Sequence, residues 1–450
     1  MNTPTKSVNA WILPYEDDPA GSGYKSPDSS YQNLINYGVY NYLDMLNICF
    51  ANTVPTSGTT VPTGDGSTHT VELQTANHPG RITNDQYMEW IIQDARQMNP
   101  DIKILLTLGY ANNEFTQIFS GPESGWQVQA TAYANNVVAY LKNYGLNGFD
   151  IDWEWDFSTD TPTKQMSLVL QALRTAFNAQ PQIYYLTLSP ATNDHLDGTV
   201  VNDTVDFITM QLYCDCTGPG EYTGIGISQS LLAYGAKFES KGNGDTTPYQ
   251  NAQEAYQGMT GGSITYGITT QWRLNSGDFQ YEQAQQMILS QLVNGIPGTT
   301  FDDTAIIGAA GNPTISQMIV RSGEVLDAIQ ATNTGTFESE PVSYILLQHG
   351  GNGGNPNTVA IPSGDSISEV SGYTGIWYGW LCVLQITIKT TGGKVFGPFG
   401  TMTSATSKTP FTYTAPSGQS IVAFSGSIVE VPLAGGGLTY VVASLEATIA

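Results

Sequence analysis

The residues best placed to do chemistry lie in one stretch, residues 145–156, with the sequence GLNGFDIDWEWD. Side chains alternate along a β-strand, so Asp150, Asp152 and Glu154 are expected on one face and the apolar residues between them on the other. Three carboxylates on one face repel one another, so at least one of them must hold a proton or bind a cation. This costly arrangement favours a catalytic site over the alternative, a structural or calcium-binding acidic edge.

Around these carboxylates the sequence resembles the family 18 glycoside hydrolases, which include chitinases and endo-β-N-acetylglucosaminidases. The family signature is Asp-Gly-x-Asp-x-Asp-x-Glu, and residues 147–154 match it everywhere except the first position, where Asn147 stands. The resemblance covers roughly residues 8 to 294. It implies a (β/α)8 TIM barrel with its active site at the carboxyl ends of the strands.

Supporting motifs follow in the order that the family requires. Residues 103–110 resemble the third-strand motif Ser-x-Gly-Gly, with Thr107 for Ser and Tyr110 for the second Gly. Residues 210–213, Met-Gln-Leu-Tyr, resemble the sixth strand with its essential Tyr, and Trp272 follows the last expected strand. The departures at Asn147 and Tyr110 affect the details of the pocket more than its chemistry.

The resemblance implies retaining hydrolysis in which the substrate's own 2-acetamido group replaces the usual carboxylate nucleophile. Glu154 is then the general acid and later the base that activates water, and Asp152 orients the acetamide and stabilises the oxazolinium ion. Asp150 shares a proton with Asp152. Tyr213 donates a hydrogen bond to the acetamido oxygen, so the four catalytic residues are Glu154, Asp152, Asp150 and Tyr213.

Three further residues are implied to bind substrate. Gln211 would hold the sugar or polarise the water, Trp272 would form the floor of the subsite beside the cleaved bond, and Thr107 would hydrogen-bond Asp150. The expected substrate is a β-1,4-linked N-acetylglucosamine glycan such as chitin. This chemistry requires no cofactor, and no metal site is expected.

Two other functions fit the same residues. The first is an endo-β-N-acetylglucosaminidase that cleaves N-glycans, because the loops that shape the subsites cannot be folded from sequence. The second is a non-catalytic chitinase-like lectin or toxin component whose barrel only binds sugar. The intact Glu154 disfavours this second function, since lectins of the family have lost the acid.

Strand-like and helix-like segments alternate through the first two thirds of the chain. Such alternation predicts parallel strands, and about eight of them over about 300 residues favour a closed barrel over an open sheet. Long loops are expected at residues 52–80 and 215–230, where barrel enzymes build their sites. The expected strands are residues 41–51, 101–108, 148–153, 184–190, 205–213, 230–238 and 263–272, and the expected helices are residues 85–98, 127–144, 162–178 and 282–293.

The composition changes near residue 296, which predicts a barrel domain at 1–296 and an all-β domain at 297–450. No convincing helix follows Thr299, and short β-rich runs alternate with Gly-rich turns. The expected strands include one opened by residues 301–303 and runs at 315–321, 343–348, 380–389, 420–424 and 439–444. In order and spacing these segments resemble the jacalin-related lectins, which implies a β-prism of three four-stranded sheets.

The lectin resemblance implies one sugar site and disfavours another. Gly323 to Asp327 fits a Gly-x-x-x-Asp loop, and Gly350-Gly351 fits the neighbouring Gly-Gly loop. Asp327 can accept hydrogen bonds from two hydroxyls while the glycines let a sugar approach the backbone; the alternative is that both loops only turn the chain. Mannose- or glucose-type sugars are the candidate ligands. At the family's other site, residues 439–443 lack the carboxylate.

Charge and composition limit the partners. With 15 Lys+Arg against 39 Asp+Glu, the formal charge of -24 disfavours nucleic acid and anionic membrane surfaces. No apolar run approaches the length of a membrane span, so no membrane insertion is expected. Met1 to Ala10 lacks the apolar segment of a secretory signal, so we expect a cytoplasmic protein, or export without a leader to act on extracellular glycans. Four Cys, with Cys214 and Cys216 only two apart, predict reduced thiols. The oligomeric state stays open.

Overall fold

The computed structural model describes residues 3–14, 23–56, 69–74, 82–110, 114–213, 217–239, 250–294, 300–307, 311–337, 340–432 and 438–450. Contacts between residues divide the chain into two compact units, Met1–Glu282 and Gln283–Ala450. This division falls inside helix α9 (Phe279–Asn294), whereas the change of composition lies just beyond that helix.

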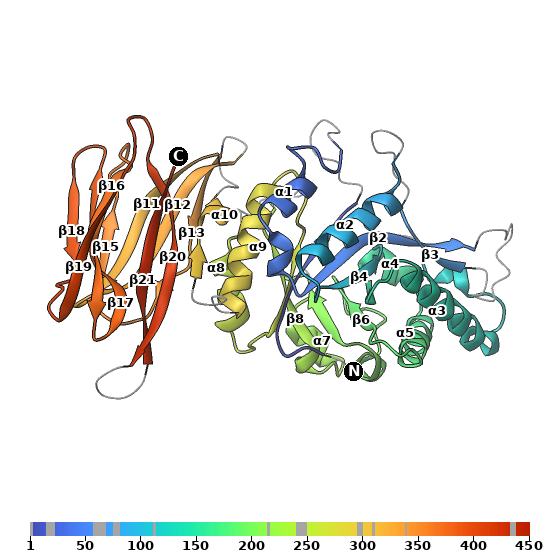
Figure 1. Cartoon of the computed structure of the whole chain (residues 1–450). Helices are drawn as coiled ribbons and strands as arrows, with labels where there is room; N and C mark the ends of the chain where they lie inside the picture. Colours follow the sequence, from blue (N-terminus) through green and yellow to red (C-terminus); the bar gives the residue numbers. More distant parts are fainter. Residues whose placement is uncertain are drawn as a thin grey trace. The chain divides into compact units, whose positions relative to one another are not determined.

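The first unit is the predicted barrel. Its eight parallel strands follow the order β1-β9-β8-β7-β6-β5-β4-β2, and a further pairing of β1 with β2 closes the ring. Figure 1 shows the helices of this unit outside the strands. The strands are β1 (Ser7–Ile12), β2 (Met45–Pro55), β4 (Lys103–Leu108), β5 (Gly148–Ile151), β6 (Tyr185–Leu188), β7 (Phe207–Met210), β8 (Leu232–Lys237) and β9 (Ile268–Trp272).

A helix connects each strand of the barrel to the next, and the best predicted helix is α2 (Asn84–Met98). Thr83 caps it by accepting a hydrogen bond from the Gln86 N–H, and Met88, Ile91, Ile92 and Ala95 form its buried stripe. The other helices are α1 (Ser30–Asn36), α3 (Trp126–Asn143), α5 (Thr163–Asn178), α6 (Gly198–Thr204), α7 (Pro219–Gly224), α8 (Ala252–Thr260) and α9, and the short α4 (Trp155–Asp160) directly follows the acidic motif.

Three parts of the barrel differ from the sequence-based expectation. Strand β1 was not predicted, although it pairs with both β2 and β9 and so closes the barrel. The expected loop at 52–80 contains the end of β2 and the strand β3 (His69–Leu73), which form an antiparallel hairpin. The expected loop at 215–230 contains the helix α7. Both segments were too polar for their periodicity to stand out.

Apolar side chains fill the barrel near the amino-terminal ends of its strands. One buried cluster joins five strands, with Tyr185 of β6 packed against it: Met45, Leu105, Phe207, Ala233 and Ile268. Most of these residues are the first or second of their strand, so this layer closes one end of the barrel. The polar residues that follow are therefore left to line the opposite, carboxyl end.

Beyond α9, the described residues of the second unit are all-β apart from the short helix α10 (Thr304–Ile307), which the sequence analysis missed. Its buried core includes Val325, Cys382, Leu384, Val431 and Val441. The described strands are β10 (Thr300–Asp302), β11 (Gly311–Ser322), β12 (Leu326–Phe337), β13 (Glu340–Ile345), β14 (His349–Gly350), β15 (Asn355–Ala360), β16 (Ile367–Trp377), β17 (Trp380–Thr390), β18 (Val395–Phe399), β19 (Ala405–Thr414), β20 (Ile421–Pro432) and β21 (Leu438–Ile449).

The strands of this unit form three groups of unequal size rather than three sheets of four. Strands β11 to β15 form one five-stranded sheet, and the remaining seven strands form a second hydrogen-bonded sheet. Within the second sheet a single residue pair, Ile367 with Ile421, joins β16–β19 to the group of β10, β20 and β21. This arrangement keeps the threefold division that the lectin resemblance implies.

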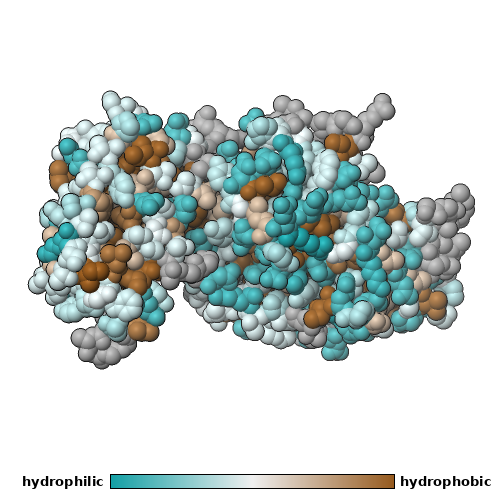
Figure 2. Space-filling model, viewed as in Figure 1, coloured by the Kyte–Doolittle hydropathy of each residue, from teal (hydrophilic) through white to brown (hydrophobic). Residues whose placement is uncertain are grey.

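The two units differ in the side chains that they expose. In the view of Figure 2 the barrel unit is mostly teal and pale, whereas brown, hydrophobic residues gather at several places on the β-rich unit. Most of the large hydrophobic side chains exposed among the described residues lie in the β-rich unit, including Tyr378, Leu381 and Leu438.

Candidate active site

The acidic motif keeps its strand alternation beyond the end of β5. The Asp152 N–H donates to the Leu108 carbonyl on one side, and the Trp153 N–H donates to the Ser189 carbonyl on the other. Glu154 is still extended, with φ -114° and ψ 172°, before α4 begins. Asp150, Asp152 and Glu154 therefore share one face of the strand, as the sequence predicted.

Asp150 is held by hydroxyl groups from the two neighbouring strands. The register pairs it with Thr107 on β4 and Thr187 on β6, and both hydroxyls donate to it, at 3.1 and 2.6 Å. The Ser189 hydroxyl lies 3.0 and 2.9 Å from the two carboxyl oxygens. Burial raises the pKa of Asp150, whereas these hydrogen bonds lower it and favour the carboxylate.

Gln211 bridges the other two carboxyls. Its side-chain nitrogen lies 2.9 Å from Asp152 Oδ1, 3.0 Å from Glu154 Oε1 and 3.0 Å from the Ser189 carbonyl. Burial and the nearby carboxyls of Glu154 and Asp150 raise the pKa of Asp152 well above its ordinary value. Asp152 therefore favours its protonated form, which removes part of the repulsion in the cluster.

Tyr213 follows β7 and lines the same cleft as Asp152 and Glu154. Burial, then the charges of Asp152 and Glu154, raise the pKa of Tyr213 well above its ordinary value. The phenol therefore keeps its proton and can donate a hydrogen bond.

These side chains open into a cleft of about 480 Å³ whose walls are aromatic. Trp272 packs edge-on against Trp11, with ring centroids 5.9 Å apart, and lies 5.7 Å from the ring of Phe50. Tyr110 meets Phe50 at 5.1 Å and is 44% exposed. The lining comprises Trp11, Leu13, Phe50, Tyr110, Asp152, Glu154, Ser189, Gln211, Tyr213, Lys237, Trp272 and Arg273.

The structure changes the interpretation of three residues. Thr107 makes the predicted hydrogen bond to Asp150, but it is fully buried and also accepts from the Trp11 indole, so it positions Asp150 and does not line the cleft. Tyr110, treated as a departure from a glycine motif, lines the cleft. Asn147 lies at the start of β5, where its side-chain oxygen accepts from the Ile104 N–H at 3.0 Å and from Arg96 at 3.2 Å. The motif's first position is therefore structural in this chain.

Several cleft residues were missed by the sequence analysis: Trp11, Leu13, Phe50, Ser189, Lys237 and Arg273. Trp11, Leu13 and Phe50 are at most 3% exposed, and hydrophobic periodicity does not distinguish them from ordinary core residues. The signal that could have identified them is their position toward the carboxyl end of a strand: Phe50 lies on β2, within the expected strand 41–51, whereas Trp11 and Leu13 required β1 to be recognised.

Beside the barrel's carboxyl end, Glu114 forms a buried contact with the end of β2. It accepts a short hydrogen bond from the Thr53 N–H, and the Thr53 hydroxyl lies 3.0 Å from that of Tyr133. Burial raises the pKa of Glu114 from its ordinary 4.5 to about 7, although the bonds from Thr53 lower it. The folded barrel therefore prefers the protonated acid.

The Glu114→Gln variant should gain stability relative to the parent as the pH rises. Because the pKa of Glu114 is raised in the folded state, protonation of this residue stabilises the folded parent. This contribution to stability is complete below pH 4.5 and is lost as the pH rises past about 7. Glutamine keeps the acceptor without the charge, so its advantage should grow by on the order of 3 kcal/mol between pH 4 and pH 8. Unfolding by urea across this range measures the difference. The exposed Glu123→Gln variant is the control, and a pH-independent difference for Glu114→Gln would contradict the prediction.

The β-rich unit contains a second pocket, of about 660 Å³, around Asp327. Gly350, Gly351, Gly353 and Gly354 line it with Asp327 at the start of β12, and an added Cβ at Gly353 would lie only 2.3 Å from Asp327 Oδ1. Oδ2 of Asp327 is buried without a hydrogen-bond partner. Burial raises the pKa of this carboxyl, whereas Gly323 and Arg321 lower it.

The Asp327 pocket unites the two loops that the sequence analysis paired. Gly323 does not line the pocket, but its ideal Cβ would lie 3.6 Å from Asp327 Oδ2. The Gly351 N–H donates to the carbonyls of Asp327 and Tyr440, at 3.1 and 3.0 Å. The pocket is also lined by residues 438–440, which overlap the segment expected at the family's other site, and by Asn352 and Trp377.

The remaining chemistry-bearing groups add no further centre within the described residues. Cys49 and Cys382 are buried thiols outside any disulfide, and Cys214 and Cys216 lie outside the part that the structure describes. Across the described ranges, no three His, Cys, Asp or Glu side chains gather in a way that could hold a metal ion. Nor does any described helix combine the length and apolarity needed to cross a membrane.

Comparison with known proteins agrees with the division into two units. The β-rich unit matches the jacalin-like lectin domain over residues 290–430. Among solved structures, the galactose-binding lectin from Champedak with Gal(beta)1,3-GalNac is 25% identical, covering 34% of this chain and 99% of that chain, with a TM-score of 0.26. Artocarpin in complex with mannopentose is 19% identical, covering 34% and 90%, with the same TM-score of 0.26.

The chain also resembles a curated protein. Chitinase 1 of Aphanocladium album is 25% identical over 179 residues, which are 38% of this chain and 39% of that protein. The chain therefore matches about two fifths of the length of this relative. The model of the glycosyl hydrolases family 18 matches residues 22–305, well over half of the chain, and this match includes the acidic motif and every strand of the barrel except β1. The chain belongs to the glycosyl hydrolases of family 18.

Proposed function

We propose that this protein hydrolyses β-1,4-linked N-acetylglucosamine glycans with retention, by substrate-assisted catalysis, and that its β-rich unit binds carbohydrate. The observation that carries the proposal is the bridge from Gln211 to Asp152 and Glu154 at the bottom of an aromatic cleft. In this arrangement Glu154 lines the cleft as the proton donor, and Asp152 lines it as the group beside the donor.

Glu154 acts first, as the proton donor to the glycosidic oxygen. As the last extended residue before α4, it lines the cleft that is to hold the leaving group. As the bond between C1 and this oxygen breaks, the oxygen takes the proton, and the departing sugar leaves as a neutral alcohol. Glu154 becomes a carboxylate that accepts from Gln211.

The acetamido carbonyl oxygen of the substrate attacks C1 and forms the oxazolinium ion. Asp152 accepts a hydrogen bond from the acetamide N–H and stabilises the positive charge of the oxazolinium ion. Tyr213 donates a hydrogen bond to the acetamido oxygen and so fixes the geometry of its attack on C1. To stabilise the positive charge, Asp152 must release its own proton, and the carboxylate of Asp150 takes up that proton. The three hydroxyls around Asp150 hold it in place throughout.

Water completes the reaction from the side that the leaving group vacated. Glu154, now a carboxylate, takes a proton from this water as its oxygen bonds to C1. The acetamide is released from C1, so two inversions give net retention. Trp272, Trp11 and Tyr110 supply the apolar faces on which sugar rings stack.

Hydrolysis of a chromogenic chitobioside, with the anomer of the first product followed by NMR, tests this proposal. The β-anomer should form first. An N-glycosylated protein tested in parallel distinguishes the endo-β-N-acetylglucosaminidase, since release of its glycans with an inert chitobioside would favour that function. An inert barrel that still binds chitobiose would favour the non-catalytic lectin and contradict hydrolysis.

For the β-rich unit we propose that Asp327 accepts hydrogen bonds from two sugar hydroxyls at the Gly350–Gly351 loop. The position of the Asp327 carboxyl at this pocket and the surrounding glycines support this site. The Asp327→Ala variant should lose about tenfold or more in retention on mannose- or glucose-bearing resin, because a charge-assisted bond to each hydroxyl disappears. Kinetics on the chromogenic chitobioside should not change.

The matched control for Asp327 is Asp365→Ala, at a turn of the same unit. Affinity chromatography and a glycan array measure both variants. Retention equal to that of the parent would show that this pocket binds no sugar, leaving the unit as a scaffold or a protein-binding surface.

A further inference from the structure

Part of the cleft's aromatic wall is built where the first and last strands of the barrel meet. Trp11 of β1 and Trp272 of β9 pack edge-on, with ring centroids 5.9 Å apart. The regular pairing of the two strands ends at Ala10 with Gln271, one residue before each tryptophan. One further backbone bond follows, from the Leu274 N–H to the Trp11 carbonyl at 3.0 Å. The spacing of the two rings therefore depends on contacts beyond the regular strand pairing.

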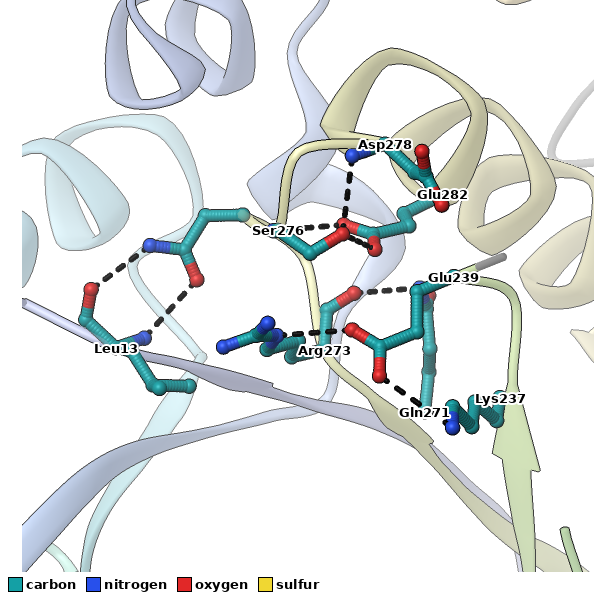
Figure 3. A network of polar contacts seen from close by, with 9 residues as sticks. Leu13, Lys237, Glu239, Gln271, Arg273, Ser276, Asp278 and Glu282 are labelled. Carbon is teal, nitrogen blue, oxygen red and sulfur yellow. Dashed lines mark hydrogen bonds and ion pairs between the residues drawn. The ribbon is translucent and has the colours of Figure 1, made fainter. Parts of the chain in front are cut away.

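The Asn275 side chain continues this pairing where β1 and β9 have ended. Its oxygen accepts a hydrogen bond from the Leu13 N–H at 3.0 Å, and its nitrogen donates to the Leu13 carbonyl at 2.8 Å (Figure 3). One side-chain amide thus pairs both backbone groups of one residue, as the opposite residue of an antiparallel strand would. Both residues are buried, so these bonds are protected from water. We call the two bonds the Asn275 clamp.

The segment that carries Asn275 is itself held on both sides, as Figure 3 shows. Before Asn275, the Arg273 Nε donates to Glu239 at 3.0 Å. After it, the Ser276 N–H donates at 3.1 Å to Glu282, a completely buried residue in the first turn of α9. The amide of Asn275 is therefore held in place, which also fixes the backbone that it binds.

The Asn275 clamp acts on the part of β1 that reaches the cleft. Trp11, Leu13 and Trp272 line the cleft, whereas Asn275 is not among its lining residues in the described part of the chain. Trp11 lies two residues before Leu13, so fixing the Leu13 backbone limits how far Trp11 can move from Trp272. The groups proposed to carry out the chemistry come from the ends of β5 and β7 and contact one another. A change at Asn275 should therefore alter sugar binding before it alters the chemical step.

We propose that Asn275 is a positioning residue of the sugar-binding cleft: through Leu13 it aligns Trp11 with Trp272 and so sets the affinity of the aromatic wall for a sugar ring. The inference rests on the proposed function, because it takes the cleft to bind sugar. Without the clamp the two indole rings can move apart, and a sugar ring then loses contact with one of them. This loss weakens binding of the substrate and of the transition state alike, which raises KM and leaves kcat nearly unchanged.

Initial rates of the full chain carrying Asn275→Ala on the chromogenic chitobioside test the inference. KM should rise about tenfold, whereas kcat should stay within about threefold of the parent value. Calorimetric titration with chitobiose, in a chain that also carries Glu154→Gln, should show the same loss of affinity without hydrolysis. The Tyr31 hydroxyl still donates to the Leu13 carbonyl in this variant, at 2.7 Å in the parent, so we expect the chain to fold.

The matched control is Asn99→Ala, which removes the same kind of contact at the other end of the barrel. The Asn99 amide donates to the carbonyls of Tyr40 and Leu43, at 3.0 and 2.9 Å, between α2 and the start of β4. This variant should keep the parent KM. Thermal unfolding of both variants shows whether they lose similar stability, so that a rise in KM confined to Asn275→Ala reports positioning.

Two results overturn the inference: a KM of Asn275→Ala within about twofold of the parent, or an equal rise in KM in Asn99→Ala. If Asn275→Ala does not fold, Asn275→Asp decides by the same criteria. Its carboxylate keeps an acceptor for the Leu13 N–H but has no proton to donate to the Leu13 carbonyl, so KM should again rise. Failure of the proposed function looks different, because the parent chain then neither hydrolyses the chitobioside nor binds chitobiose.

Discussion

The Glu154→Gln variant should lose about 10³-fold or more in kcat on a chromogenic chitobioside while still binding chitobiose. Glutamine has nearly the shape of glutamate and can still accept from the Gln211 amide, which bonds Glu154 at 3.0 Å. It has no proton to give to the glycosidic oxygen, and it cannot take one from water. Both chemical steps therefore lose their acid or base, whereas the aromatic walls that hold the sugar are unchanged.

Initial rates and calorimetric binding on the same preparation check this expectation. Glu89→Gln, on the exposed side of α2, is the matched control and should turn over normally. Hydrolysis by Glu154→Gln within tenfold of the parent rate would show that another group protonates the leaving oxygen.

The second large effect concerns the substrate. A chitobioside whose reacting sugar carries a free amine, or a cellobioside with a hydroxyl there, should turn over at least about 10³-fold more slowly. Neither has the carbonyl oxygen that attacks C1, and the nearest protein carboxyl, Asp152, favours its protonated form and is bonded by Gln211. Asp152 and Glu154 are the carboxyls that line the cleft among the described residues, and Glu154 already serves as the acid, so neither is left to form the covalent intermediate.

A graded series sharpens this test. Mono-, di- and trifluoroacetyl substrates differ little in size, but fluorine withdraws electrons from the attacking oxygen, so the rate should fall with each fluorine. An enzyme that used a protein nucleophile would cleave the cellobioside at a comparable kcat/KM and would respond little to fluorine.

The acidic motif was predictable because its information is local. Alternation along an extended chain fixes the common face of Asp150, Asp152 and Glu154, and the structure keeps this alternation through Trp153. Gln211 and Tyr213 lie far away in sequence, and only the resemblance to family 18 placed them in the same site. The contacts of Gln211 with both carboxyls depend on closure of the barrel, which no single sequence window contains.

The sequence-based prediction failed at elements and site residues where the pattern of polar and apolar residues does not follow the period of a strand or a helix. Strand β11 begins at Gly311, whereas the sequence predicted a strand from residue 315. The first residues of β11 are exposed or half-exposed and have the composition of a turn, so the prediction did not include them. Lys237 and Arg273 are unremarkable as isolated basic residues. Only the pairing of Lys237 with Trp272 brings them to one wall.

The pairing of β1 with β9 has a consequence for how activity returns on refolding. Trp11 lies on β1 and Trp272 on β9, and these two strands are far apart in sequence. A hydrogen bond between Asn9 and Thr270, for example, spans 261 residues. Bringing such distant segments together costs loop entropy and is slow compared with local folding. The cleft is thus complete only when the first and last strands have met. Recovery of hydrolysis after dilution from denaturant should therefore lag behind recovery of helix content. The rate at which hydrolysis returns then reports the rate at which the barrel closes.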